Sequence, residues 1–259
     1  MHYIFDGTYC GWLCCVFEAF ERKEFYSMPV TRASYMGDIF GQERQIHTNP
    51  DKANRIIKGL EKIIGKEKSK DFYRAFLFEN QQVWKAAFDI AVQIFKGNIF
   101  VLDNYGDDAV MKFSDALKKV SRERHRMKAF VRFQVGGDGL YFAMVEPDFN
   151  VLPLIINFFK NRYTDQVWII FDLKRHYGIH WNKREITEVE LNTAQKNDIV
   201  QSTTIISLDE QEEYYKNLWL QYFKSTNIEA RRNMKLHLRH VPKRYWKFLP
   251  EKAFGKVSL

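Results

Sequence analysis

The stretch VSRERHRMKAFVRFQVGGDGLYFAMVEPDFNVLPLIINFFKNRYTDQVWIIFDLKRHYGIHW, residues 120–181 of the 259-residue chain, decides the fold because helical and strand-like patterns alternate in it. Apolar residues three and four positions apart predict helices, and short runs rich in β-branched and aromatic residues predict strands. The predicted elements are a helix over residues 108–127, a strand over 130–133, a glycine turn at 136–139, the hairpin partner at 140–145, a helix over 151–163, a strand over 167–172 and a turn at 174–178. This order predicts an α+β unit.

Charged residues fall at or next to the ends of these elements. They are Arg126, Arg132, Glu146, Asp148, Arg162, Asp165, Asp172 and Arg175. Loop residues that a rigid scaffold positions commonly form binding or catalytic sites, so the group is a candidate site. Each residue taken alone is more typical of a solvated surface charge or a weak ion pair. Both interpretations stay open for the group.

The flanking sequence predicts the other parts of a single α+β domain. Thr8 is expected to cap a helix after a strand at residues 3–5, and its junction with Asp6 and Gly7 is interpreted as an ordinary turn, since phosphate-binding loops need more than one glycine. Further predictions are one or two strands within 21–48, helices over 49–65 and 69–97, an edge strand or connection within 183–207, and a helix that opens at Ser207. The predicted subregions of the domain, residues 1–259, are an N-terminal αβ part (1–48), a helical part (49–127), a central β-rich unit (128–182) and a basic helical tail (207–259).

The composition is that of a folded, basic protein. A hydrophobic share of 46% is enough for a core, while no run of about 18 apolar residues and no signal-peptide pattern occurs, so a cytoplasmic protein without membrane contact is expected. Cys10, Cys14 and Cys15 lack the spacing of an iron–sulfur motif and are predicted to be buried helix cysteines. His176 and His180 lie four apart in a turn-and-strand context, and no metal site or cofactor is expected.

The C-terminal tail combines cations with aromatic rings. Its net charge is positive from residue 228 to residue 250, through Arg231, Arg232, Lys235, Arg239, Lys243, Arg244 and Lys247, with Tyr245, Trp246 and Phe248 among them. Lysines and arginines neutralise phosphates, and rings stack on unpaired bases, so this composition is typical of nucleic-acid binding. The chain's net charge of +8 and pI of about 9.2 favour the same partner, with an anionic membrane as the competing one. Alternatively, the rings dock the tail on the core and the cations only solubilise it.

Several segments together resemble one bacterial family of probable DNA metabolism proteins of unknown function. They are SRERHRMKAFVRF (121–133), MVEPDFNVLPLIINFFKNRY (144–163), WIIFDLKRHYGI (168–179), LWLQYFKSTNIEARRN (218–233), FDGTYCGWL (5–13) and VPKRYWKFLPE (241–251). Members of that family occur beside a radical-SAM protein and are elsewhere joined to a uracil-DNA-glycosylase-like domain. The resemblance therefore implies a role in DNA metabolism with such a partner, and it implies no catalytic residues.

The leading hypothesis is a DNA-binding protein of DNA repair or modification that acts on single-stranded or damaged DNA with a radical-SAM or glycosylase-like protein. In this hypothesis Tyr245 or Trp246 stacks on an unpaired base. The expected backbone contacts are Arg126, Arg132, Arg162, Arg175, Arg231, Arg232, Lys243 and Arg244.

Two alternatives belong to other functional classes. In the first alternative, the central unit is an enzyme that acts on a nucleic-acid base or sugar, with a general acid or base drawn from His125, Glu146, Asp148 and Asp172. In the second alternative, the chain is a scaffold that binds only a protein partner, through aromatic surface near Tyr177 and Trp181. The first needs the four groups to share a cleft, and the second needs the two rings to be accessible.

Overall fold

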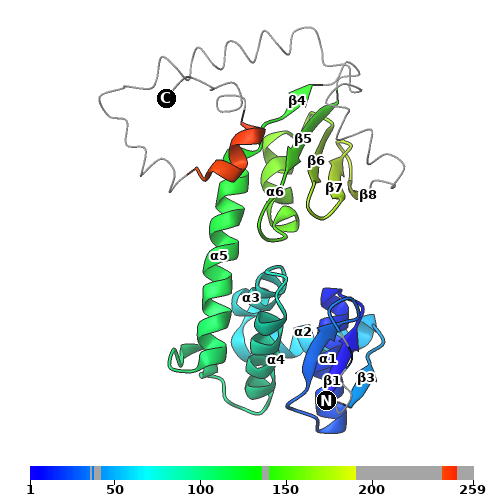
Figure 1. The fold of residues 1–259 in the computed structure, drawn as a ribbon, viewed down its shortest axis with the longest axis vertical. Helices are drawn as coiled ribbons and strands as arrows, with labels where there is room; N and C mark the ends of the chain where they lie inside the picture. The colour runs from blue at the N-terminus through cyan, green and yellow to red at the C-terminus, as the bar shows by residue number, and fades with distance from the viewer. Residues whose placement is uncertain (36, 38–41, 136–139, 191–240, 250–259) are drawn as a thin grey trace. The chain divides into compact units, whose positions relative to one another are not determined.

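The computed structural model describes residues 1–35, 37, 42–135, 140–190 and 241–249, and the chain divides into two compact units, Met1–Arg122 and Glu123–Leu259 (Figure 1). Each unit combines helices with its own β-sheet, so the predicted α+β class is confirmed. The glycine turn at 136–139, the helix opening at Ser207, and Arg231 and Arg232 lie outside the described residues. The single domain with four subregions stays a prediction.

The first unit opens with a parallel three-stranded sheet in the order β2-β1-β3. The strands are β1 (His2–Phe5), β2 (Met28–Thr31) and β3 (Glu43–Gln45). Thr8 caps helix α1 (Tyr9–Arg22), because its side-chain oxygen accepts a hydrogen bond from the backbone N–H of Gly11 at 3.0 Å. The predicted first strand, the helix cap and the further strands are thus confirmed.

Helices complete the first unit. They are α2 (Pro50–Ile64), α3 (Lys66–Phe76), α4 (Gln81–Phe95), the short 3₁₀ helix η1 (Val101–Asp103) and α5 (Asp108–Phe130), whose last residues belong to the second unit. The single helix predicted over residues 69–97 is wrong. It is divided because Glu79 adopts a positive φ of 55° and Asn80 caps α4 by accepting hydrogen bonds from the N–H groups of Gln82 and Val83.

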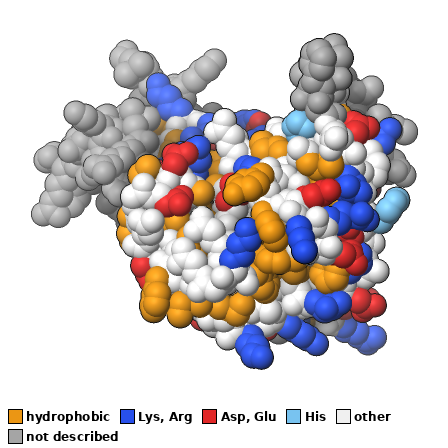
Figure 2. Space-filling model, turned by 90° about the horizontal axis from the view of Figure 1, so that it is seen from below, with side chains coloured by type: hydrophobic (Ala, Val, Ile, Leu, Met, Phe, Trp, Pro, Cys, Tyr) orange, Lys and Arg blue, Asp and Glu red, His pale blue; other side chains and the backbone are white. Residues whose placement is uncertain are grey.

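Aromatic side chains build the core of the first unit, as the helical spacing predicts. Trp12, Phe72 and Phe88 are fully buried among them. Cys14 and Cys15 are buried too and Cys10 is partly buried, in agreement with the prediction of helix cysteines. Other large hydrophobic side chains stay exposed, and Figure 2 shows such side chains among lysines and arginines on the face it presents. No described helix is both long and apolar enough to cross a membrane.

The second unit is built on a five-stranded sheet in the order β4-β5-β6-β7-β8. Its elements are β4 (Gln134–Val135), β5 (Tyr141–Val145), α6 (Leu152–Arg162), β6 (Trp168–Asp172), β7 (Tyr177–Trp181), β8 (Ile186–Glu190) and the 3₁₀ helix η4 (Lys243–Phe248). Of the two alternatives within residues 183–207, the edge strand is confirmed as β8, and a hairpin is present in which β4, not residues 130–133, pairs with β5. The strand predicted over residues 130–133 is wrong, because α5 continues to Phe130 and strand pairing begins only at Gln134.

The connection through α6 makes β5 and β6 parallel neighbours. Val145 pairs with Asp172 in the register of these strands, so the segments that follow them leave the sheet at the same edge. Ligands of α/β sheets bind at the carboxyl ends of parallel strands. The topology therefore brings together Glu146 to Asp148, after β5, and Lys174 and Arg175, after β6.

Candidate functional site

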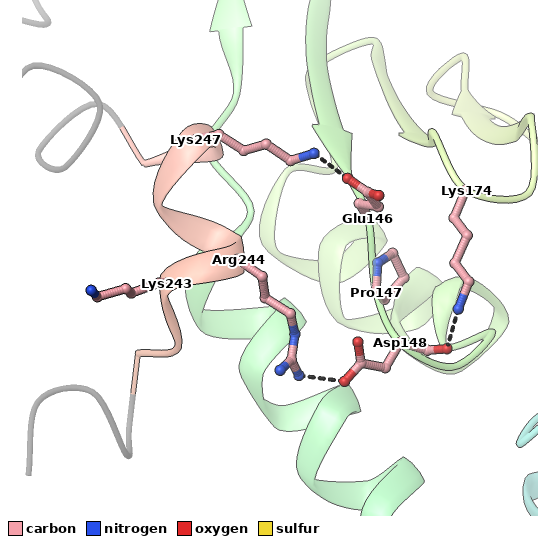
Figure 3. A pocket seen from close by; sticks show the side chains of 7 residues that line it. All are labelled: Glu146, Pro147, Asp148, Lys174, Lys243, Arg244 and Lys247. Carbon is pink, nitrogen blue, oxygen red and sulfur yellow. Dashed lines mark hydrogen bonds and ion pairs between the residues drawn. The ribbon is translucent and has the colours of Figure 1, made fainter.

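A pocket of about 420 Å³ lies at this edge of the second unit (Figure 3). Three segments that are distant in sequence line it, namely the turn after β5, the turn after β6, and η4. The lining residues are Glu146, Pro147, Asp148, Lys174, Lys243, Arg244 and Lys247. Six of the seven are charged, so the pocket is suited to a charged group.

Asp172 holds the turn after β6, which lines the pocket, in place. Its side chain is fully buried, and its Oδ1 accepts hydrogen bonds from the backbone N–H groups of Lys174 at 2.9 Å and Arg175 at 3.2 Å. Its Oδ2 accepts a hydrogen bond of 2.8 Å from Nη1 of Arg175. Burial raises the pKa of Asp172 above its usual value, and the Arg175 guanidinium opposes that rise. The turn after β6 is thereby fixed.

Arg175 and Lys174 join the two turns to each other. The Arg175 guanidinium donates to the backbone carbonyls of Pro147 and Asp148, both at 3.1 Å. Nζ of Lys174 also donates to the Asp148 carbonyl, at 2.9 Å. Charged donors to backbone carbonyls form stronger bonds than neutral donors, so this side of the pocket has a defined geometry.

Helix η4 supplies the opposite side. Arg244 forms an ion pair with Asp148 at 2.5 Å, and Lys247 forms one with Glu146. Lys243 extends away from both carboxylates in Figure 3 and pairs with none of the residues that the structure describes. Each carboxylate after β5 is therefore matched by one cation of η4.

Glu123 holds η4 against the rest of the unit. Its carboxylate is 1% exposed, and Oε1 accepts hydrogen bonds from the backbone N–H of Asp148 at 2.9 Å and from the Tyr245 hydroxyl at 2.5 Å. Arg126 and Arg244 lie 3.6 Å and 3.5 Å from Oε2. Burial, together with the hydrogen bond to Glu123, raises the pKa of Tyr245. Sequence reasoning missed Glu123, and its one local signal is an acidic residue inside the basic run SRERHR.

The structure brings together only part of the predicted site. Glu146, Asp148, Lys243 and Arg244 line the pocket, and Asp172, Arg175 and Arg126 support it. Sequence reasoning omitted Lys174 and Lys247 from the predicted site, although Lys174 opens the predicted turn at 174–178 and Lys247 belongs to the basic tail.

Other predicted residues lie elsewhere in the second unit. His125 and Arg162 are exposed and do not line the pocket, and Arg132 donates to the backbone carbonyls of Ala129 and Val131. Among the four acid–base candidates, only the two carboxylates after β5 therefore share this pocket.

Tyr245, predicted as one of two rings that stack on a base, is 1% exposed, so its ring is not accessible to a base in this structure. Trp246 is only partly buried, and its indole N–H donates to the Val241 carbonyl at 3.1 Å. Trp181, proposed as scaffold surface, is 2% exposed, and the Tyr177 hydroxyl is bonded to Asn150. Accessible aromatic surface is found instead in the first unit, where Phe100 is 70% and Tyr105 is 66% exposed.

Asp6 in the first unit is a structural carboxylate. Oδ1 accepts hydrogen bonds from the backbone N–H and the hydroxyl of Thr8, at 2.9 Å and 2.7 Å, and Oδ2 accepts one from Thr48 at 2.6 Å. A Cβ on Gly11 would lie 2.3 Å from Oδ1, so any side chain at this position would displace the Asp6 carboxylate. Partial burial acts against ionisation, but the bonds from Thr48 and Thr8 outweigh it and lower the pKa of Asp6.

Asp6→Asn is expected to destabilise the first unit in a pH-dependent way. A lowered pKa in the folded state stabilises the fold above the unfolded pKa, and this contribution is lost as pH falls through the folded pKa. The difference in the free energy of unfolding between the wild-type protein and the variant should thus be largest near neutral pH and shrink below about pH 4. Urea unfolding at several pH values measures it, and a difference that grows on acidification would contradict the assignment.

The described residues contain no group of three or more His, Cys, Asp or Glu side chains that could hold a metal ion. A family model matches residues 81–251, and its description is a domain of unknown function, DUF4130. The matched region includes every residue that lines the pocket. No curated protein and no solved structure matches the chain.

Proposed function

Because the chain belongs to this family of domains of unknown function, we propose its function from the chemistry of the pocket: the second unit binds the phosphate backbone of single-stranded DNA. The observation that carries the proposal is that four cations, from two distant segments, line one pocket. They are Lys174, Lys243, Arg244 and Lys247. Cations that converge on a concave surface concentrate positive potential and attract polyanions.

The distribution of charge along the chain supports this assignment. Residues 123–259 carry 22 Lys and Arg against 16 Asp and Glu, whereas residues 1–122 carry 18 against 16. Six of the eight excess positive charges therefore belong to the unit that contains the pocket. Trp246 is the ring proposed to stack on an unpaired base, because it is partly exposed on the same 3₁₀ helix as three of the cations.

Replacing Lys174, Lys243 and Lys247 with glutamine should make single-stranded DNA binding less salt-dependent. Each phosphate contact on a single strand adds about 0.7 to the magnitude of the slope of log K against log salt. The slope of the triple variant should therefore be smaller in magnitude by roughly 2. Fluorescence anisotropy with a labelled oligonucleotide over a salt series measures the slope. An unchanged slope would refute the assignment of these lysines.

A matched control has the same charge change in the other unit. Lys58, Lys62 and Lys66 are exposed, and none of them pairs with a described residue. Their replacement with glutamine should leave the slope near the wild-type value. Circular dichroism melting of both triple variants shows whether the fold is retained, since Lys174 also bonds the Asp148 carbonyl.

The biological setting of this binding is proposed to be DNA repair or modification, together with a radical-SAM or glycosylase-like protein. The resemblance of six segments of the chain to DNA metabolism proteins supports this setting. Co-purification with the radical-SAM protein in the presence and absence of single-stranded DNA tests it, and a complex that forms equally well without DNA would argue for a scaffold instead.

A second candidate function is catalysis on a base or sugar of the bound strand. It is favoured by one observation, that Glu146 and Asp148 share the pocket with the cations. A carboxylate beside cations can act as a general acid or base on a bound phosphodiester ligand. Asp148→Asn would then abolish base release or strand cleavage in an oligonucleotide assay while binding persists; a wild-type protein without turnover rejects this function.

A further inference from the structure

The shape of the pocket favours a terminal group over the middle of a strand. Its volume of about 420 Å³ lies within the range of small-ligand pockets, roughly 300–1,000 Å³. An internal phosphodiester continues into the chain on both sides, whereas a terminal phosphate is free to enter a concave site. The turns after β5 and β6 and helix η4 surround the hollow on different sides (Figure 3).

The charge of the pocket matches a dianion. Four cationic and two anionic side chains line it, which leaves an excess of two positive charges. A phosphodiester carries one negative charge, while a phosphomonoester carries close to two at neutral pH because its second pKa is about 6. The lining therefore neutralises a phosphomonoester more fully than a phosphodiester.

Arg244 has donors left for such a ligand. Its contacts to Asp148, Glu123 and Tyr245 within the described residues all use Nη2. Nε and Nη1 form no hydrogen bond or ion pair with the residues that the structure describes, and the side chain is 41% exposed. A guanidinium presents its N–H groups in a planar fork that fits phosphate oxygens.

The position of Arg244 is also set before any ligand binds. The guanidinium packs 4.5 Å from the centre of the Tyr245 ring and is held by the carboxylates of Asp148 and Glu123. On the facing side, the bond from Lys174 to the Asp148 carbonyl fixes a second cation. Donors that are already positioned lose less entropy when the ligand binds.

We propose that this pocket binds a phosphomonoester, carried either by the phosphorylated end of a DNA strand or by a free mononucleotide. The inference rests on the proposed function and narrows it from backbone binding to recognition of a phosphate group with two charges. Phosphate oxygens bind Arg244, Lys247 and Lys174. Without a ligand, the carboxylates of Glu146 and Asp148 hold Lys247 and Arg244 at the pocket through ion pairs. A bound phosphate replaces part of these ion-pair contacts.

The test compares one oligonucleotide with a 5′-phosphate, a 3′-phosphate or hydroxyl groups at both ends, and adds thymidine monophosphate as a competitor. A phosphorylated end should bind about tenfold more tightly at pH 7.5, the size of one added charge-assisted hydrogen bond. The preference should disappear below about pH 6, where the phosphate loses its second charge. If thymidine monophosphate competes with the oligonucleotide and thymidine does not, the free nucleotide is also a ligand.

Two variants assign the preference to the pocket. Lys247→Gln should reduce the tenfold preference strongly, and Arg244→Lys should reduce it while keeping the charge, because ammonium lacks the planar fork. Lys58→Gln in the first unit should retain it. Equal binding of phosphorylated and hydroxyl-ended strands, or a preference that survives in Lys247→Gln and Arg244→Lys alike, would overturn the inference and leave the proposed function standing. Failure of every strand to bind would reject the proposed function itself.

Discussion

Glu123→Ala is expected to lower the free energy of unfolding of the second unit by about 3–5 kcal/mol, the usual cost of removing one partner from a buried charged network. The substitution leaves the Tyr245 hydroxyl and the Asp148 N–H without their acceptor, and it leaves two arginines without a buried counter-charge. Helix η4 should detach first, because Glu123 bonds its Tyr245. Urea unfolding gives the free energy, and hydrogen exchange at the Asp148 amide reports the local change.

Matched variants separate this network from a general loss of charge. Glu188→Ala removes an exposed glutamate of β8 in the same unit and should change the free energy of unfolding by less than about 0.5 kcal/mol. Glu123→Gln keeps the shape and one acceptor oxygen, so its effect should fall between the two. If Glu123→Ala unfolds like Glu188→Ala, the proposed role of Glu123 is wrong.

Asp172→Ala is expected to destabilise the second unit by a similar amount, about 3–5 kcal/mol. The alanine leaves the nearly buried Arg175 guanidinium without its counter-ion and two backbone N–H groups without an acceptor. Because Arg175 and Lys174 join the turns that line the pocket, single-stranded DNA binding should weaken as well. Urea unfolding and anisotropy titration measure the two effects; normal stability with normal binding would contradict the account.

The pH dependence of the Asp172 contribution has a defined sign. Its pKa is raised by burial, so the protonated form is favoured in the folded state. The contribution of this group is therefore fully present below the unfolded pKa, near 4, and falls as pH rises through the folded pKa. Asparagine does not titrate, so Asp172→Asn should remove this group's contribution to the pH dependence of the free energy of unfolding. The control substitution Glu188→Gln should leave that pH dependence unchanged.

Local patterns in the sequence predict much of the fold, and where they fail the reason is physical. The sequence predicts the N-caps Thr8 and Asn49, because in each case a capping side chain directly precedes apolar residues at helical spacing. The run FVRF at residues 130–133 is too short to distinguish a period of 2 from one of 3.6, so the last residue of α5 and the three residues after it are predicted as a strand. The predicted turn at 174–178 includes the first two residues of β7, Tyr177 and Gly178, because a glycine beside the true turn is typical of a turn residue.

The site depends on contacts that no local pattern encodes. Lys247 and Glu146 are 101 residues apart in sequence, and Tyr245 lies 122 residues from Glu123. The sequence shows that each segment is charged, and it predicts that turns after strands carry function. It does not show which cation meets which carboxylate, and for that reason Tyr245 was predicted as a stacking ring and is in fact buried.

The central claim is that the second unit binds DNA through phosphate contacts, and the affinity of the wild-type chain for a single-stranded oligonucleotide across a salt series tests it most directly. With at least three of the pocket cations in contact with phosphates, log K should fall linearly with log salt at a slope of about −2 or steeper. Binding that is absent at low salt, or that does not change with salt, would contradict the account.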